Sequence, residues 1–330
     1  MRYLRMQAST NHFTSGWLPS LQNGGVFAKA DPETSEYFSH PLLTDPGKAL
    51  SVEASVYLHY INYGLYSYVD INFEKAKYHL DQATQLLEQS NVGLLQSQAL
   101  LYIKILYHHG VVNSLFGKKK AVEAAIQRLG ALSIRSENLQ IAQSCRLNIL
   151  RTLMWSSTSD AARVEQESGE FLDYLNVNRD RIPISQQALL YRNICLGLFM
   201  HRYIKQATAV LHYYMNEKSL HSRYDSYALM KFISLFLYFE SGAYELLKSS
   251  LASAEYVFRK KKEIFPIETI TLDFFKTLIK REDFPRLPKD LLLEYSNNLE
   301  KVSTQSDRDT MMLNASFVRR WVDSVKDSLA

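Results

Sequence analysis

The chain has 330 residues, of which 46% are hydrophobic and 22% charged, so it is long enough to bury a large core. Only 12 residues are glycine and 8 are proline, and leucine outnumbers valine and isoleucine together. This composition argues against collagen-like, disulfide-rich, disordered and β-barrel chains and favours an all-helical protein. Lysine plus arginine (38) exceeds aspartate plus glutamate (34) by four, a small excess for this length, so we expect no nucleic-acid partner.

The cysteines and the apolar segments predict a soluble, cytoplasmic protein. Cys145 and Cys195 both lie inside apolar helical patterns, which is typical of buried free thiols in a reducing compartment. The N-terminal residues 1–7 show no apolar run after their arginines, so we expect no secretory signal. The most apolar stretch, 227–239, contains Lys231 and is shorter than the roughly 20 residues that span a membrane.

The predicted elements begin with an irregular lead-in over residues 1–47, partly disordered or extended, because serine, threonine, glycine, asparagine and proline are frequent there. From residue 48 apolar residues recur at three- and four-residue spacing, as Val52, Val56 and Tyr60 do. This spacing predicts helices over 49–69, 73–89, 94–116, 119–132, 136–156, 159–176, 184–200, 203–216, 222–240, 243–263, 267–281, 289–302 and 306–328.

These helices form pairs that recur about every 40 residues, which is typical of an α-solenoid. A single helix hairpin cannot bury both of its faces, so neighbouring hairpins must stack. The first helix of each pair is apolar on more than one side, as expected for a helix with neighbours on both sides. We therefore predict an all-α, right-handed α-solenoid of about five hairpins over 48–284, closed by C-terminal capping helices over 285–330.

Residues 60–88 resemble a tetratricopeptide repeat (TPR). The likeness is carried by Tyr60 at the large first aromatic position, Tyr63-Gly64 at the Leu-Gly pair, Ala76 at the small residue that opens the second helix, and Leu80 and Ala83 at later packing positions. A second segment, 231–258, is similar through Gly242-Ala243-Tyr244, which stands where the family has a Gly-Asp-Tyr turn. The resemblance implies TPR-like hairpins with small residues where two helices approach closely.

A wider resemblance covers residues 40–330 and is to a group of bacterial helical-repeat proteins of uncharacterised function. It is carried by His40-Pro41-Leu42-Leu43, by Tyr244-Glu245-Leu246-Leu247, by Phe258-Arg259-Lys260-Lys261, and by the closing segment from Phe317 to Leu329 around Trp321. Members of that group usually carry a further helical region ahead of the repeats, which residues 1–36 do not resemble. The resemblance implies a helical-repeat fold and no particular activity.

No motif predicts an enzyme, a cofactor or a metal. Gly110 and Gly117-Lys118 have the wrong spacing for a phosphate loop and no buried strand before them. His108 and His109 are adjacent, so they point about 100° apart on a helix and lack an acidic or cysteine partner one turn away. The basic run 259–262 is interpreted as cations near a helix C-terminus, where the helix dipole favours them.

A candidate peptide-binding groove follows from one basic residue in each of four successive first helices: Lys104, Arg146, Arg192 and Lys231. Long cations inside apolar helices need water or a carboxylate at their heads, and residues one repeat apart stack along a solenoid. Asn148 and Asn193 are predicted to add amide donors. The alternative interpretation is that each cation pairs separately with an acidic residue such as Glu170 or Asp225.

The function predicted from these observations is a non-catalytic scaffold whose concave groove binds a protein or peptide partner, an acidic one if the four cations line the groove. The alternative is a regulatory or peptide-sensing helical-repeat module that controls a partner protein. An enzyme is not expected, because the spacing assembles no set of acid, base, nucleophile and oxyanion donors.

Overall fold

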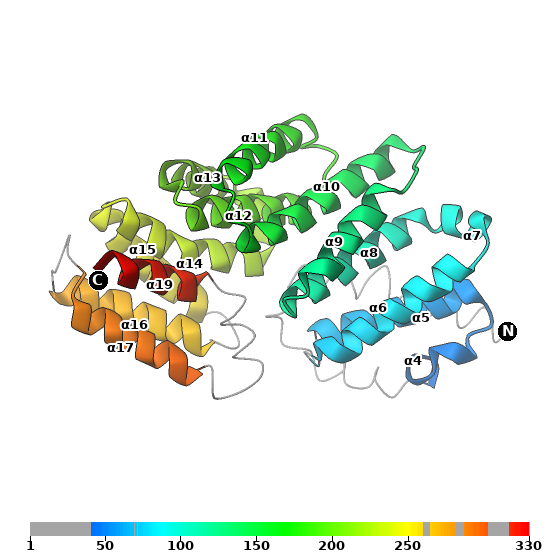
Figure 1. The fold of residues 1–330 in the computed structure, drawn as a ribbon, viewed down its shortest axis with the longest axis horizontal. Helices are drawn as coiled ribbons and strands as arrows, with labels where there is room; N and C mark the ends of the chain where they lie inside the picture. Colours follow the sequence, from blue (N-terminus) through cyan, green and yellow to red (C-terminus); the bar gives the residue numbers. More distant parts are fainter. Residues whose placement is uncertain are drawn as a thin grey trace. The chain divides into compact units, whose positions relative to one another are not determined.

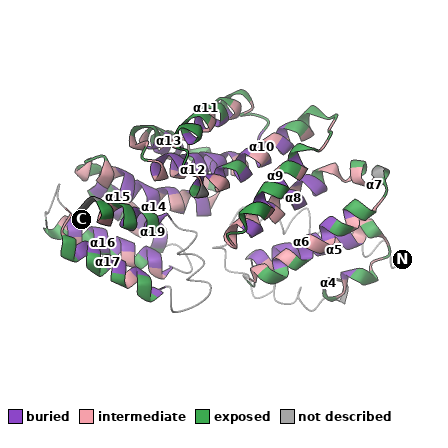
Figure 2. Ribbon diagram, in the orientation of Figure 1, coloured by how far each residue is buried: buried purple, intermediate pink, exposed green. Residues whose placement is uncertain are grey.

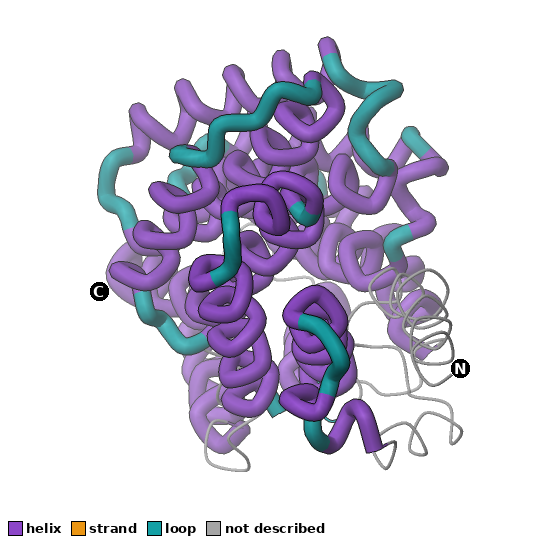
Figure 3. The backbone as a smooth tube through the Cα atoms, turned by 90° about the vertical axis from the view of Figure 1, so that its right-hand side faces the viewer, coloured by secondary structure: helices purple, strands orange, loops and turns teal. Residues whose placement is uncertain are grey.

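Figure 1 shows a computed structural model of the chain, which describes residues 41–68, 70, 72–259, 265–281, 287–302 and 317–329. These residues form α-helices and short 3-10 helices, and no strand occurs among them (Figure 3). The predicted all-α class is confirmed. Most of the predicted lead-in, residues 1–40, lies outside the described residues.

The chain divides into two compact units. Unit 1 comprises Met1–Met154, Leu175–Gln187 and Ser222–Asp225, and unit 2 comprises Trp155–Tyr174, Ala188–His221 and Ser226–Ala330. The first 154 residues contain the elements α4 (Pro41–Thr44), η3 (Pro46–Lys48), α5 (Val52–Tyr68), α6 (Phe73–Gln89), α7 (Val92–Ser97), α8 (Ala99–Leu115), α9 (Lys119–Gly130) and α10 (Glu137–Met154).

The helices of unit 1 pack around α8. Helix α5 lies against α6, and α8 contacts α6, α9 and α10. Buried residues occur on several sides of α8, whereas α9 buries only a narrow stripe of Val122, Ala125 and Leu129 (Figure 2). Gly110 permits the approach of α8 to α10, because a Cβ atom there would lie 2.7 Å from Leu150 Cδ2. In this pair, α8 is thus buried on more sides than α9.

Local sequence explains where several helices begin and how the lead-in is attached. Asn72 and Asn91 are the N-caps of α6 and α7, and their side chains accept hydrogen bonds from Lys75 N and Leu94 N. The buried Asn62 donates a hydrogen bond to the carbonyl of Leu43 at 2.7 Å. This bond attaches the short helix α4 to α5.

The remaining elements belong wholly or mostly to unit 2. They are η4 (Trp155–Ser157), α11 (Ala161–Val177), α12 (Ile184–Met200), α13 (Ile204–Asn216), η5 (Lys218–Ser222), α14 (Tyr224–Glu240), α15 (Tyr244–Arg259), α16 (Pro266–Arg281), α17 (Lys289–Val302) and α19 (Val318–Leu329). Helix α16 contacts α15 and α17, and α17 contacts α19.

Aromatic rings from four helices, together with Phe317 just before α19, form the core around α19. Phe236 of α14 contacts the rings of Phe275 in α16 and Trp321 in α19, with centroids 5.1 and 5.0 Å away. Trp321 Nε1 donates to Glu240 Oε1 at 2.6 Å, and the same carboxylate pairs with Arg202 at 2.9 Å. The wider set comprises Phe199, Phe232, Phe236, Phe239, Phe274, Phe275, Phe317 and Trp321. Helix α19 is therefore held by buried rings and by one carboxylate.

A second close approach in unit 2 involves Gly197 of α12. A Cβ atom on this glycine would lie 2.3 Å from Cε3 of Trp155, which is buried. The indole ring stacks on Phe171 with centroids 5.6 Å apart, and its Nε1 donates to Glu167 Oε2 at 2.6 Å. The absence of a side chain at position 197 leaves room for this ring.

Most helix boundaries agree with the sequence predictions, and α6, α12 and α17 have the predicted bounds. The single helix predicted over 94–116 is wrong, because α7 ends at Ser97 and α8 begins at Ala99. The Gln98 side chain between them donates to Glu53 and accepts from Tyr57, both on α5. The predicted start of the last helix, 306, lies outside the described residues, and α19 begins at Val318. No helix among the described residues is long and apolar enough to cross a membrane.

Candidate functional site

The six predicted site residues lie on four helices and are divided between the two units. Lys104 is on α8 and Arg146 and Asn148 are on α10, all in unit 1, whereas Arg192 and Asn193 of α12 and Lys231 of α14 are in unit 2. A continuous groove through all four cations therefore stays a prediction.

In unit 1, Lys104 and Arg146 are close enough for the charge of Arg146 to act on Lys104. Lys104 is half-buried, and burial together with the charge of Arg146 lowers the pKa of its ammonium group. Arg146 is only 7% exposed, and its Nη1 donates to the carbonyl of Ala142 at 2.9 Å. Its Cζ atom lies 6.0 Å from the ring centroid of Tyr107, in the range of a cation–π contact.

Among the described residues, no acidic side chain pairs with Lys104 or Arg146. The acidic residues proposed as alternative partners are engaged elsewhere: Asp225 pairs with Arg223 at 3.0 Å, and Glu170 accepts a hydrogen bond from Gln166 at 2.9 Å. A buried cation such as Arg146 is normally compensated by a carboxylate or another anion, because burial penalises the charged form. The pair is therefore suited to binding an anion.

His108 completes this cluster, and the sequence analysis did not place it in the site. It lies one turn after Lys104 on α8, and its Nδ1 is 2.6 Å from the Tyr63 hydroxyl on α5. Its ring contacts those of Tyr60, Tyr63 and Tyr107, with centroids 5.9, 4.8 and 4.8 Å away. The i, i+4 spacing from Lys104 was the available signal, because such residues share a helix face. We call Lys104, Arg146, His108, Tyr63 and Tyr107 the cationic cluster.

Burial, and then the positive charges around it, favour the neutral form of the His108 imidazole. Burial lowers its pKa well below the usual 6.5, and the positive charges of Arg146, Lys104 and Arg223 lower it further. Asn148 is buried on α10, two residues after Arg146, and residues at this spacing face different sides of a helix. It therefore lies outside the cationic cluster.

The predicted site residues of unit 2 have different surroundings. Arg192 donates from Nε and Nη2 to the amide oxygen of the neighbouring Asn193, at 3.0 and 2.8 Å. Lys231 is half-buried, its ammonium group lies 5.6 Å from the ring centroid of Tyr227, and burial lowers its pKa. No acidic side chain among the described residues pairs with Lys231.

Within the described part of the chain, one histidine–acid pair joins α8 and α6. His109 Nε2 lies 2.8 Å from Asp81 Oδ1, and its Nδ1 lies 3.2 Å from Nδ2 of Asn113. Both ring nitrogens are thus engaged, which leaves neither one to exchange a proton with a substrate in this arrangement. The pair acts as a contact between helices, and the prediction that the chain is not an enzyme stays a prediction.

The other sites weighed in the sequence have ordinary structural surroundings. Gly110 lies within α8 rather than in a loop after a strand. Burial raises the pKa of the Cys145 thiol to about 12 and that of Cys195 still higher, so neither is a poised nucleophile. No group of three or more potential metal ligands occurs among the described residues. Most of the basic run 259–262 lies outside them.

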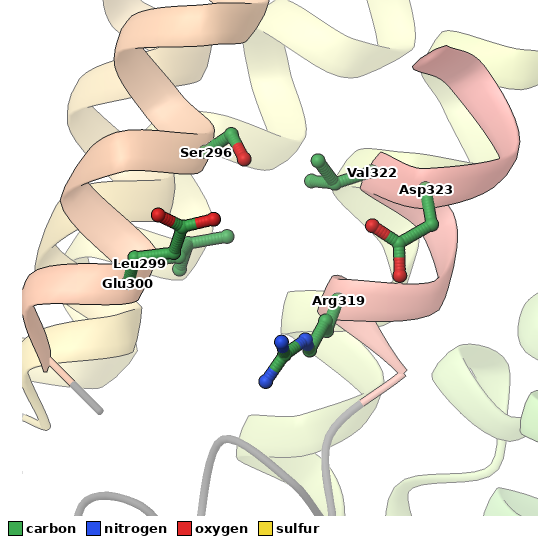
Figure 4. A pocket seen from close by; sticks show the side chains of 6 residues that line it. All are labelled: Ser296, Leu299, Glu300, Arg319, Val322 and Asp323. Atoms are coloured by element: carbon green, nitrogen blue, oxygen red, sulfur yellow. The ribbon is translucent and has the colours of Figure 1, made fainter. Parts of the chain in front are cut away.

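Unit 2 also has a small pocket between α17 and α19 (Figure 4). Ser296, Leu299 and Glu300 of α17 face Arg319, Val322 and Asp323 of α19 across it. Its volume of about 40 Å³ has room for water molecules rather than for a metabolite, whose pockets measure roughly 300 Å³ or more.

Comparison with known proteins gives this chain no family. No family model matches it, and neither does any curated protein or solved structure.

Proposed function

We propose that the chain is a non-catalytic scaffold, a TPR-like α-solenoid whose first helices bind an acidic segment of a partner protein. The helix hairpins α5–α6 and α8–α9 support the repeat interpretation, since each packs an inner helix against a more exposed partner. The two buried cysteines, which form no disulfide, agree with a reducing compartment, and we propose the cytoplasm.

The observation that carries the proposal is the uncompensated charge in the cationic cluster. Lys104 and Arg146 approach each other closely enough for one charge to lower the pKa of the other. A bound carboxylate would neutralise both cations and accept hydrogen bonds from the guanidinium and the ammonium group. Tyr107, which is half-buried, supplies a rigid ring with a polar tip, which suits the contact surface around such an anchor.

The test is calorimetric titration with a short peptide that contains three glutamates, compared with the same peptide carrying glutamine. We expect the chain to bind the glutamate peptide and not the glutamine peptide. Lys104→Gln and Arg146→Gln should each weaken binding by about tenfold or more, because a hydrogen bond to a charged group contributes roughly 1.5–3 kcal/mol.

Lys120→Gln is the matched control, because it removes the same charge from an exposed position of α9 in unit 1 and should leave affinity within about twofold. Circular dichroism and urea unfolding would show that each variant keeps its fold. Equal affinity for the two peptides, or full affinity in both cluster variants, would contradict the proposal.

A further inference from the structure

We propose that binding of a carboxylate at the cationic cluster is coupled to uptake of one proton by His108, which makes the affinity of this site increase as the pH falls. This inference rests on the proposed function and adds a regulation of the same site. Its geometric basis is the position of His108 one turn from Lys104 and in ring contact with Tyr107, over whose ring Arg146 lies.

The contacts of His108 permit both protonation states. Its Nδ1 bonds the Tyr63 hydroxyl, which can donate to a neutral imidazole and accept from an imidazolium, so this bond survives protonation. Among the described residues, Nε2 has no hydrogen-bond partner. A protonated His108 would therefore have one N–H group available to an anion beside Lys104 and Arg146.

The groups that face His108 come from three helices and one connecting segment. Tyr60 and Tyr63 approach it from α5, and Lys104 and Tyr107 flank it on α8. The charge of Arg146 on α10 and that of Arg223, just before α14, both lower the pKa of His108. Asp225, in the first turn of α14, pairs with Arg223 and offsets its charge. Lys104 and Arg146 are thus the uncompensated charges that disfavour a proton on His108.

A bound carboxylate reverses this balance. It neutralises the two cations and adds a negative charge near the imidazole, so the pKa of His108 rises above its value in the free protein. Between these two pKa values the complex holds one more proton than the free chain. Over that window the affinity increases by up to tenfold for each unit by which the pH falls. Near pH 4 the carboxylate itself becomes protonated, and binding weakens again.

Lys104 is a second group whose protonation binding can favour, because the pKa of its ammonium group is also lowered in the free protein. Proton uptake by Lys104 would occur at higher pH than uptake by His108, since the ordinary lysine pKa is near 10.5. Lys104→Arg keeps the charge and removes this titration, so it separates the lysine from the histidine.

The experiment is calorimetric titration of the full chain with the three-glutamate peptide at pH 6 and pH 8. Each pH is measured in two buffers with different ionisation enthalpies, so that the number of protons taken up is counted directly. We expect tighter binding and net proton uptake at pH 6 in both the unmodified chain and Lys104→Arg. His108→Gln should bind at pH 6 with no uptake and should lose the pH dependence.

A titration of the free protein supplies an independent readout. The imidazole signals are followed by NMR, with His108 assigned by its loss in His108→Gln. Lys104→Gln should raise the pKa of His108, and Lys120→Gln should leave it unchanged. Peptide binding without proton uptake, or uptake that persists in His108→Gln, would overturn the inference while leaving the proposed function intact. Absence of binding to the acidic peptide at both pH values would overturn the proposed function and this inference with it.

Discussion

The contact between Gly197 and Trp155 gives a sharp prediction for stability. In Gly197→Ala the new methyl group would lie 2.3 Å from Cε3 and 2.9 Å from Cζ3 of the indole. Carbon atoms in favourable contact are roughly 3.5–4.0 Å apart, so the ring or the helix must move by about 1 Å. We expect the substitution to destabilise unit 2.

The magnitude follows from two opposing effects. Trp155 cannot move freely, because it stacks on Phe171, bonds Glu167 through Nε1, and has its carbonyl bonded to His201. Overpacking at a rigid site costs about 1–3 kcal/mol, and this geometry points to the upper part of that range. Alanine is favoured over glycine within a helix by about 1 kcal/mol. The expected net loss in the free energy of unfolding is about 2 kcal/mol.

The assay is urea unfolding followed by tryptophan fluorescence, since Trp155 and Trp321 both lie in unit 2. The control is Gly169→Ala on α11, where a Cβ atom has nothing within 4 Å. This variant gains the helical preference of alanine without a clash, and its free energy of unfolding should rise by about 0.5–1 kcal/mol. If both variants were stabilised to the same extent, the close contact at Gly197 would be refuted.

Three further predictions concern thiols, histidines and one turn. Because burial raises the pKa of Cys145 to about 12 and that of Cys195 further, a disulfide reagent at pH 8 should modify neither thiol until urea unfolds the chain; rapid reaction of the folded chain would contradict this. Burial lowers the pKa values of His59 and His79 to about 4, so between pH 6.5 and 4 the unfolded chain binds more protons than the folded chain. The free energy of unfolding should therefore decrease as the pH is lowered from 6.5 to 4. In His59→Gln/His79→Gln, urea midpoints measured from pH 7 to 5 should change less steeply than in the parent chain. Gly242 has a φ of 70°, and a Cβ atom there would meet no other atom within 4 Å. Gly242→Ala should therefore lower the free energy of unfolding by about 1 kcal/mol through backbone strain alone. An unchanged urea midpoint would contradict the positive φ at this turn.

Much of the fold could be predicted because its determinants are local. The spacing of apolar residues was enough to predict the bounds of α12 and α17. The break between α7 and α8 could not be found in this way. Gln98, at this break, is hydrogen-bonded to Glu53 and Tyr57, which precede it by 45 and 41 residues. The cause of the break is therefore a tertiary contact.

The candidate site was only partly accessible from the sequence. Lys104 and Arg146 stood out because each interrupts an apolar helix, a signal that needs no knowledge of the fold. The role of His108 requires knowing that Tyr63 and Arg146, on different helices, meet around it. Arg223 acts on the same imidazole from more than a hundred residues away in sequence, and no periodic pattern in a single chain reports such a contact.

The position of α19 has a consequence for the order in which this protein matures. During synthesis, residues 318–329 leave the ribosome only after helices α12 to α17 have been completed. Until then Phe236 and Phe274 lack the indole of Trp321, and Glu240 lacks its indole hydrogen bond. The nascent chain therefore passes through a stage with an open aromatic surface, which invites self-association or chaperone binding. A chain terminated after Val302 would remain at that stage, and we expect it to bind a hydrophobic dye strongly and to aggregate where the full chain does not.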